Sequence, residues 1–171
     1  MSYPVINKHY LFIFLVSLYS LAACNYSSGV SAGVKKDLST GLSTTYKNMA
    51  PDKVFLVMNG EVLNTSDIPL GQKFTVMNEN VKGLKERDGK ISMGCSLKIT
   101  DEAGKIMLEE KDLFEGGDIF KPEDAGLLQC GVTTGEPMNW EEKYKVDVVF
   151  WDKYGDGKIE NKLTIRAIRK P

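Results

Sequence analysis

Acidic side chains are concentrated in one stretch of the sequence, between residues 109 and 124. Seven carboxylates stand there against two lysines, which gives the stretch a net charge of −5. The pair Gly116-Gly117 favours a loop, and Phe114 and Phe120 are suited to tuck into a core while the acids face water. Clustered carboxylate oxygens are the ligands that Ca²⁺ prefers, so the stretch is a candidate site for Ca²⁺ or for a basic partner surface. A solvated loop kept soluble by its charge is the alternative interpretation. The seven acids are Glu109, Glu110, Asp112, Glu115, Asp118, Glu123 and Asp124.

A second stretch, which begins at Asp152, partly matches the calcium-binding loop D-x-[DN]-x-[DN]-G. Asp152, Asp156 and Gly157 fit that pattern, but Tyr154 stands where the loop needs an acid and Leu163 where it needs a bidentate glutamate. The flanking residues also have the pattern of strands, whereas the motif requires helices. We therefore favour a plain hairpin turn here and assign no metal ligand.

Aromatic side chains suggest a third kind of chemistry, the stacking of sugar rings. Trp140, Tyr144, Trp151 and Tyr154 lie close together in the sequence and could form a glycan-binding face. Aromatic residues on strands more often pack in the core or against neighbouring strands, and this is the interpretation that we favour.

The scarcity of histidine excludes most catalytic chemistry. His9 is the only histidine in the sequence, and it precedes the point at which we expect the chain to be cleaved. Without imidazole the mature chain has neither a Ser-His-Asp nor a Cys-His arrangement, and it offers no histidine ligand to zinc, copper or iron. A pair of carboxylates could still hydrolyse a glycosidic bond. Because the acids are concentrated in one loop, we predict a protein that is not an enzyme and has no catalytic residues and no cofactor.

Two cysteines, Cys95 and Cys130, remain after the amino-terminal region. An even pair in an exported protein favours a disulfide, which would close a loop of about 35 residues and contribute about 3–4 kcal/mol in the chain-entropy model. Two buried free thiols acting as small hydrophobic residues are the alternative.

The amino terminus has the layout of a secretory signal. Lys8 and His9 precede an apolar run of about 14 residues that ends in small residues. The run is shorter than the roughly 20 apolar residues that a membrane-spanning helix needs. Its last four residues, Leu21-Ala22-Ala23-Cys24, resemble the lipobox of bacterial lipoproteins. The resemblance implies cleavage after residue 23 and acylation of Cys24, and two or three acyl chains would anchor the protein stably.

The resemblance to bacterial lipoproteins also bears on location. In those of bacteria with two membranes, an Asp after the acylated cysteine commonly retains the protein at the inner membrane. Asn25 stands at that position, which favours the outer membrane. No acidic residue lies between residues 25 and 36, so an orientation toward the periplasm is preferred to export to the cell surface.

Composition divides the chain into three parts. Residues 1–23 form the expected signal peptide, residues 24–36 a Ser/Gly-rich tether behind the lipidated cysteine, and residues 37–171 a single domain. Loss of Lys8 with the signal changes the formal net charge from −1 to −2. Such a balance offers no footprint for nucleic acid.

Short strands dominate the expected domain. The clearest alternation of apolar and polar residues runs from Ile91 to Ile99 and directs Cys95 inward; a similar pattern around Cys130 does the same. Turn signals every 8 to 12 residues or so predict an antiparallel β-sandwich, Ig-like or C2-like, with one short helical turn near 121–128. The other expected strands cover residues 38–46, 53–58, 61–63, 73–77, 105–108, 128–132, 144–151 and 158–168.

Three segments resemble those of a group of uncharacterised bacterial lipoproteins with β-sandwich domains. They are DLSTGL at 37–42, DLF at 112–114 and FWDKYGDGKI at 150–159. The resemblance implies the same fold and anchoring but transfers no functional residue. We expect a lipid-anchored, non-catalytic binding or accessory subunit of an envelope assembly, held by its membrane anchor and contacting an envelope protein. A glycan- or Ca²⁺-binding sandwich module is the alternative.

Overall fold

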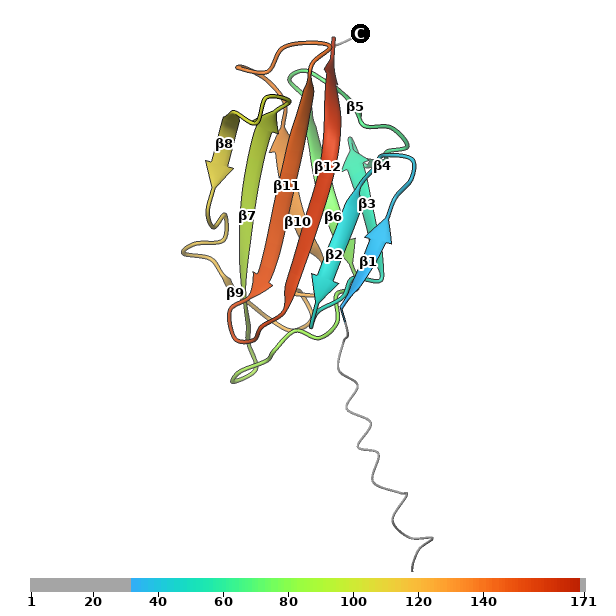
Figure 1. Ribbon diagram of the computed structural model, residues 1–171. Helices are drawn as coiled ribbons and strands as arrows, with labels where there is room; N and C mark the ends of the chain where they lie inside the picture. The colour runs from blue at the N-terminus through green and yellow to red at the C-terminus, as the bar shows by residue number, and fades with distance from the viewer. Residues whose placement is uncertain (1–31, 170–171) are drawn as a thin grey trace, which may run out of the picture.

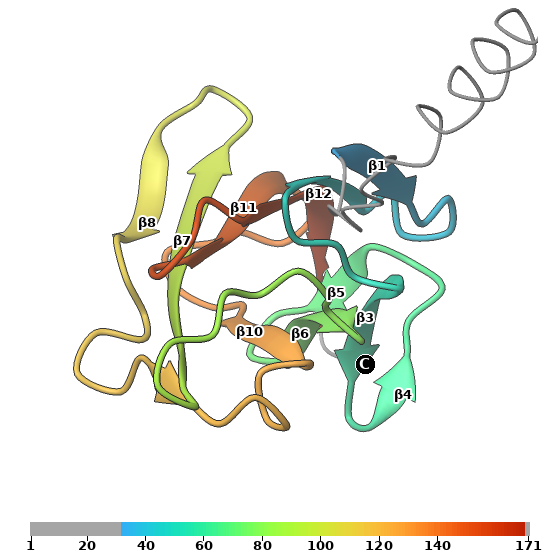
Figure 2. The ribbon, with the colours of Figure 1, turned by 90° about the horizontal axis from the view of Figure 1, so that it is seen from below.

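The computed structural model describes residues 32–169, and these residues fold into two antiparallel β-sheets packed face to face (Figure 1). The expected signal peptide, the lipidation site Cys24 and most of the tether lie outside this range. Residues 32–169 contain no helix that could cross a bilayer. Figure 2 shows the two layers end-on, with the core between them. The predicted all-β sandwich is therefore confirmed.

The larger sheet has eight strands. In spatial order its main path is β1 (Gly33–Lys36), β2 (Ser43–Lys47), β12 (Lys158–Ile168), β11 (Lys143–Asp152), β7 (Ile91–Asp101) and β8 (Ile106–Glu110). Two short strands lie off this path: β5 (Asp67–Pro69) runs parallel to the end of β12, and β9 (Ile119–Phe120) pairs with the start of β7. The edges of the main path are β1 and β8.

The smaller sheet has four strands and covers the other side of the core. Its spatial order is β10 (Leu128–Thr133), β6 (Lys73–Glu79), β3 (Lys53–Met58) and β4 (Glu61–Val62). The β3–β4 hairpin turns at Asn59-Gly60, where both residues have positive φ, as the asparagine-glycine pair predicts. Its edges are β10 and β4.

Alternation along the long strands builds the core, as the sequence predicts. Successive side chains of a strand point to opposite faces, so every second residue of β7, β11 and β12 is buried between the sheets. On the outer face of β7, Gly94 leaves room for the indole of Trp151, with which a Cβ at that position would collide. The largest buried side chains include Phe74, Tyr144, Phe150, Leu42, Met49 and Leu56.

The structure differs from the sequence predictions in the first two strands and near residue 121, and it adds the short strands β5 and β9, which the sequence did not predict. Gly33–Lys36, assigned to the tether, forms the edge strand β1 because β2 offers it a free edge to pair with. The expected strand at 38–46 is shorter, since Gly41 has positive φ and a turn occupies residues 38–40. Near residue 121 the chain makes a single turn, with the N–H groups of Asp124 and Ala125 donating to the Lys121 carbonyl, and no helix follows.

Two asparagines are fully buried in the core, and they differ in their partners. Asn161 on β12 accepts a hydrogen bond of 2.7 Å from the hydroxyl of Thr44. Asn78 on β6 has no hydrogen-bond partner for either amide atom among residues 32–169. Its cross-strand neighbour on β3 is Val54.

Candidate functional site

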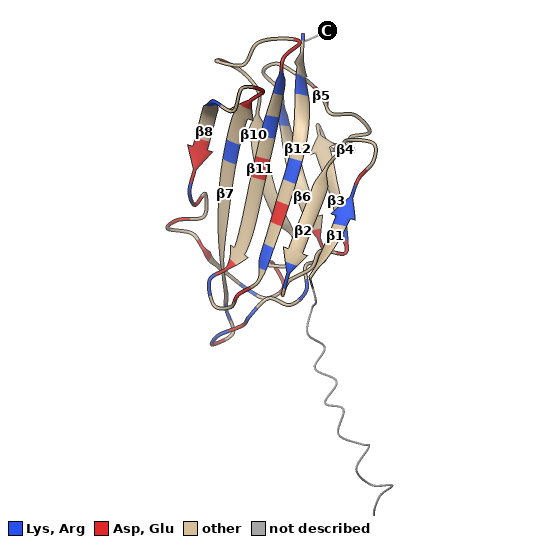
Figure 3. Cartoon of the chain, viewed as in Figure 1, with Lys and Arg blue, Asp and Glu red and all other residues tan. Residues whose placement is uncertain are grey.

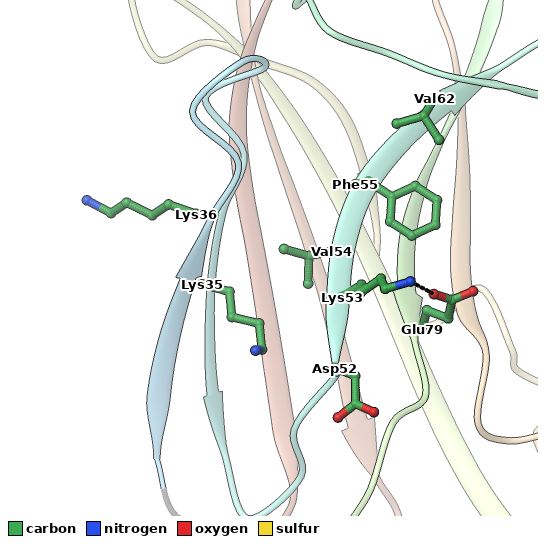
Figure 4. A pocket seen from close by; sticks show the side chains of 8 residues that line it. All are labelled: Lys35, Lys36, Asp52, Lys53, Val54, Phe55, Val62 and Glu79. Carbon is green, nitrogen blue, oxygen red and sulfur yellow. Dashed lines mark ion pairs between the residues drawn. The ribbon is translucent and has the colours of Figure 1, made fainter.

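A groove of about 650 Å³ lies where the edge strand β1 of the larger sheet meets β3 of the smaller one (Figure 4). Val54 points from β3 toward the interior, and Phe55 and Val62 add apolar surface from β3 and β4. Val62 is 64% exposed, which is high for an aliphatic side chain. The groove therefore combines an apolar lining with open access from solvent.

Charged side chains form the rim of this groove. Lys35 extends from β1 toward the space in front of β3, whereas the neighbouring Lys36 points away (Figure 4). Lys53 pairs with Glu79 at 3.5 Å, and Asp52 pairs with Lys82 outside the groove. Lys35 makes no ion pair with any residue in 32–169. One uncompensated ammonium group thus stands beside an apolar lining, a combination suited to an apolar segment that carries a carboxylate.

The acidic stretch lies on the opposite side of the sandwich. Residues 111–127, here called the crossing segment, lead from β8 in the larger sheet to β10 in the smaller one (Figure 2). The ring of Phe114 packs edge-on against Phe120 at 5.5 Å between centroids and lies 6.2 Å from Phe150 in the core. The prediction that the two phenyl rings tuck inward is confirmed.

Lys153 neutralises two acids of the crossing segment. Its ammonium group lies 2.7 Å from Asp112 and 3.0 Å from Asp118. Burial works to raise the pKa of Asp112, but hydrogen bonds from Lys153 and from the backbone N–H groups of Cys95 and Phe114 lower it overall. Hydrogen bonds from Lys153 and Ser92 also lower the pKa of Asp118, and the two acids together raise the pKa of Lys153. All three groups are therefore charged at neutral pH.

This triad has the spacing of a carboxylate pair but not its acid–base properties. Both carboxylates contact one ammonium group, so they lie within about 6 Å of each other, near the separation of a retaining glycosidase pair. Glycoside hydrolysis needs one of the two acids to be protonated, with a raised pKa. Here Lys153 lowers the pKa of both Asp112 and Asp118. The arrangement holds the crossing segment in place and does not provide a general acid.

In both stretches considered as calcium sites, carboxylates that could bind the ion already have other partners. In the hairpin, one oxygen of Asp152 accepts hydrogen bonds from the N–H groups of Tyr154 and Gly155, and the other accepts one from Lys85 at 2.6 Å. In the crossing segment, Asp112 and Asp118 form ion pairs with Lys153. No group of three or more potential protein ligands converges as a metal site within the described range 32–169.

The aromatic residues do not share a face. Tyr144 is buried, and its hydroxyl bonds the loop before β11 at Asn139 and Glu142. Trp140 precedes β11 and Tyr154 follows it, so they lie at opposite ends of a ten-residue strand, about 30 Å apart. The guanidinium group of Arg169 lies 4.1 Å from the ring centroid of Trp140, and that of Arg87 lies 4.8 Å from the ring centroid of the half-buried Tyr154.

Cys95 and Cys130 both point into the core from opposite sheets, as the alternation predicts for each of them. Cys95 lies on β7 and Cys130 on β10, and both are buried, with free thiols in this structure. Interaction with the Cys130 thiol and burial raise the pKa of Cys95. Cys95 is therefore protonated at neutral pH and is a poor nucleophile in the folded domain.

Basic residues on the outer face of the larger sheet form no comparable site. Lysines and arginines are spread along β12 and the upper part of β11 (Figure 3). They alternate with inward apolar side chains, the pattern of any solvated sheet face.

Two lysines that matter for these sites were not predicted from the sequence. Lys35 lies in the stretch expected to be a tether, and Lys153 lies in the hairpin that was considered only for its acidic residues.

Comparison of the chain with protein-family models and with curated proteins finds no match. The groove, the ion-paired crossing segment and the facing cysteines are therefore interpreted from their own geometry.

Proposed function

We propose that the protein is a lipid-anchored, non-catalytic binding or accessory subunit of an envelope assembly, facing the periplasm from the outer membrane. The observation that carries the binding role is the groove between β1 and β3 with its unpaired Lys35. The anchoring rests on the lipobox-like residues that end at Cys24. The described domain begins only a few residues after that cysteine.

The groove favours an extended peptide segment of another envelope protein as its occupant. β1 is an edge strand, so backbone groups along its outer side are free to pair with an added strand. Val54, Phe55 and Val62 offer apolar contacts, and Lys35 offers a charge that an acidic side chain complements. An acidic and apolar strand of a partner is therefore the chemistry that this surface fits.

Position in the chain adds a second argument. Because β1 begins at Gly33, residues 25–32 connect Cys24 to the sandwich, and a flexible chain of that length reaches about 15 Å on average. Gly33 pairs with Tyr46, which pairs with Ile159 at the start of β12, so β1 begins at one end of the sandwich. The groove beside β1 would thus lie near the membrane surface, where other anchored components are within reach.

Site-specific photo-crosslinking in the native envelope tests the binding role. A photoreactive residue at Val62 is expected to capture an envelope protein, whereas one at Leu108 on β8, at the opposite edge, is not. Lys35→Glu should abolish the capture and Lys36→Glu should retain it, because Lys36 points away from the groove. Equal capture at Val62 and Leu108, capture of lipid and peptidoglycan alone, or insensitivity to Lys35→Glu would refute this assignment.

Mass analysis of the protein extracted from membranes tests the anchor. We expect a chain that starts at Cys24 and carries fatty acid, and we expect Cys24→Ser to leave the membrane fraction. A purified native protein that keeps residues 1–23, or has no fatty acid on Cys24, would contradict the anchoring.

A further inference from the structure

The facing cysteines lie at the two ends of one structural unit. Cys95 is on β7 in the larger sheet and Cys130 is on β10 in the smaller sheet, with exposed fractions of 0% and 3%. Between them in the chain lie the rest of β7, strand β8 and the crossing segment. A covalent bond between the two sulfur atoms would therefore join the sheets and close this whole unit into a loop.

The crossing segment is fastened to the residue that carries the first thiol. The N–H of Leu113 donates to the Cys95 carbonyl at 2.6 Å, and the N–H of Cys95 donates to Asp112 at 3.1 Å. Phe114 then packs toward Phe150, the direct cross-strand neighbour of Cys95. Once these contacts form, the thiols lie behind the segment and between the sheets, where a protein oxidant has no access.

We propose that Cys95 and Cys130 are joined by a disulfide that forms during folding, before the crossing segment closes over them. The proposal rests on the proposed function, because it requires that the chain be exported to a compartment where a protein with an oxidised dithiol acts as the oxidant. Disulfides between facing strands are compatible with two-sheet sandwiches, and both cysteines are buried in the same core between the two sheets, where each thiol shifts the pKa of the other.

Thiol–disulfide exchange gives a balanced reaction. One cysteine thiolate attacks the oxidant's disulfide, which forms a mixed disulfide and releases one thiolate of the oxidant. The second cysteine thiolate then attacks the sulfur of the first, which forms the Cys95–Cys130 bond and releases the second thiolate. Two cysteine thiols are oxidised, the oxidant's disulfide is reduced to a dithiol, and the two thiol protons pass to the released thiolates through solvent.

The redox state can be trapped in the full-length protein. Cells are quenched in acid, and the protein is then denatured in the presence of N-ethylmaleimide, which alkylates free thiols. It is digested without reductant. The expected product is one linked peptide pair that contains Cys95 and Cys130, lighter by two hydrogen atoms than the sum of the free peptides. Alkylation of both cysteines would overturn the proposal for the cellular protein.

Refolding the purified full chain with glutathione disulfide separates two causes of such a failure. Formation of the bond in vitro but not in cells would show that the geometry is right and that export, hence the proposed function, is wrong. Failure to form the bond in vitro would overturn the disulfide itself, whatever the location of the protein.

A double-mutant cycle supplies a readout that buried free thiols would not give. Cys95→Ala or Cys130→Ala alone is expected to lower Tm by about 10 °C, and the double variant should fall little further, because either change removes the same bond. Independent losses that add in the double variant would contradict a disulfide.

Reduction kinetics test the order of events. In native buffer, dithiothreitol should leave the bond intact, and reduction should follow unfolding as urea is added. Complete reduction of the native protein within minutes would show that the bond is accessible and would overturn its closure behind the crossing segment.

Discussion

Between β8 and β10, the crossing segment covers the side of the sandwich and packs Phe114 and Phe120 against the core, whereas between β1 and β3 a groove stays open. On the closed side, Asp112 and Asp118 share the ammonium group of Lys153, and Phe114 packs against Phe120 and Phe150. On the open side, Lys35 has no carboxylate partner among the described residues. The acidic stretch, which the sequence marks as a candidate binding site, thus contains two acids, Asp112 and Asp118, that stabilise the fold.

The difference shows that charge density alone does not locate a binding surface. Of the seven acids clustered in the sequence, Asp112 and Asp118 pair with Lys153 and accept N–H or hydroxyl hydrogen bonds, and both fix the segment to the sandwich. Lys35 becomes the candidate contact because it is unpaired among the described residues and also extends toward the apolar lining of the groove. What matters for recognition is which groups remain unpaired after folding.

Removing the same ring from each side gives the largest expected contrast. Phe114→Ala should lower the free energy of unfolding by about 2–3 kcal/mol, because Phe114 packs against the core. Phe55→Ala on the groove should cost about 0.5 kcal/mol, since its ring lines an open surface. Urea denaturation measures both values, and equal losses would remove the proposed distinction between a closed and an open side.

Asn78→Leu is expected to change stability in the opposite direction. A buried amide without partners costs about 1–3 kcal/mol, and leucine has a similar branching pattern, so a gain of about 1 kcal/mol is expected. Asn161→Leu is the matched control and should destabilise, because it removes the partner of Thr44. A loss of stability in Asn78→Leu would mean that the amide is satisfied in solution.

The ion-paired triad predicts how stability depends on pH. Folding lowers the pKa of Asp112 and Asp118 below 3.8 and raises that of Lys153 above 10.5. The acids therefore stabilise the fold above pH 3.8 and lose that effect as the pH falls through their lower folded values; the lysine loses its effect only as the pH rises above 10.5. Lys153→Met should lower Tm by a few degrees at pH 7 and by less at pH 2.

Lys98→Met is the control for the triad, because Lys98 pairs with Glu109 at 3.5 Å with both side chains largely exposed. Thermal melts from pH 2 to 7 should show little difference from the parent protein. A difference between Lys153→Met and the parent that stays constant down to pH 2 would argue against an electrostatic origin.

Calcium is expected to have the smallest effect. The carboxylate oxygens of Asp152 already accept N–H hydrogen bonds, and Asp112 and Asp118 form ion pairs with Lys153. Millimolar Ca²⁺ should therefore leave Tm unchanged. Because any ligand of the folded state raises Tm, a clear rise would restore the hypothesis of a calcium module. Binding to a glycan array tests the alternative that the domain is a glycan-binding module.

The sheets were predictable wherever a strand has one buried and one solvated face. The alternation from Ile91 to Ile99 and the aspartate-glycine turn between the last two long strands give clear local signals. Strands β5 and β9 have only three and two residues, and they exist because β12 and β7 offer edges to pair with. Such pairings depend on distant residues, so no local pattern predicts them.

The candidate site was less accessible to sequence reasoning. Lys35 lies in a Ser/Gly-rich stretch that resembles a tether, and only its pairing to β2 places it beside Val54 and Phe55 on β3. Lys153 meets Asp112 and Asp118 only because the hairpin after β11 lies near the start of β7. The cysteines were easier, since period-two alternation on two separate strands was enough to direct both inward.

The two ends of the described chain lie at opposite ends of the sandwich (Figure 1). Strand β12, with 11 residues, spans most of the distance between them, about 35 Å. A fluorescent probe or affinity tag placed after Arg169 would therefore stand a full domain length from the entry of the tether. It would report the height of the protein above its support without touching the surface that we assign to the partner.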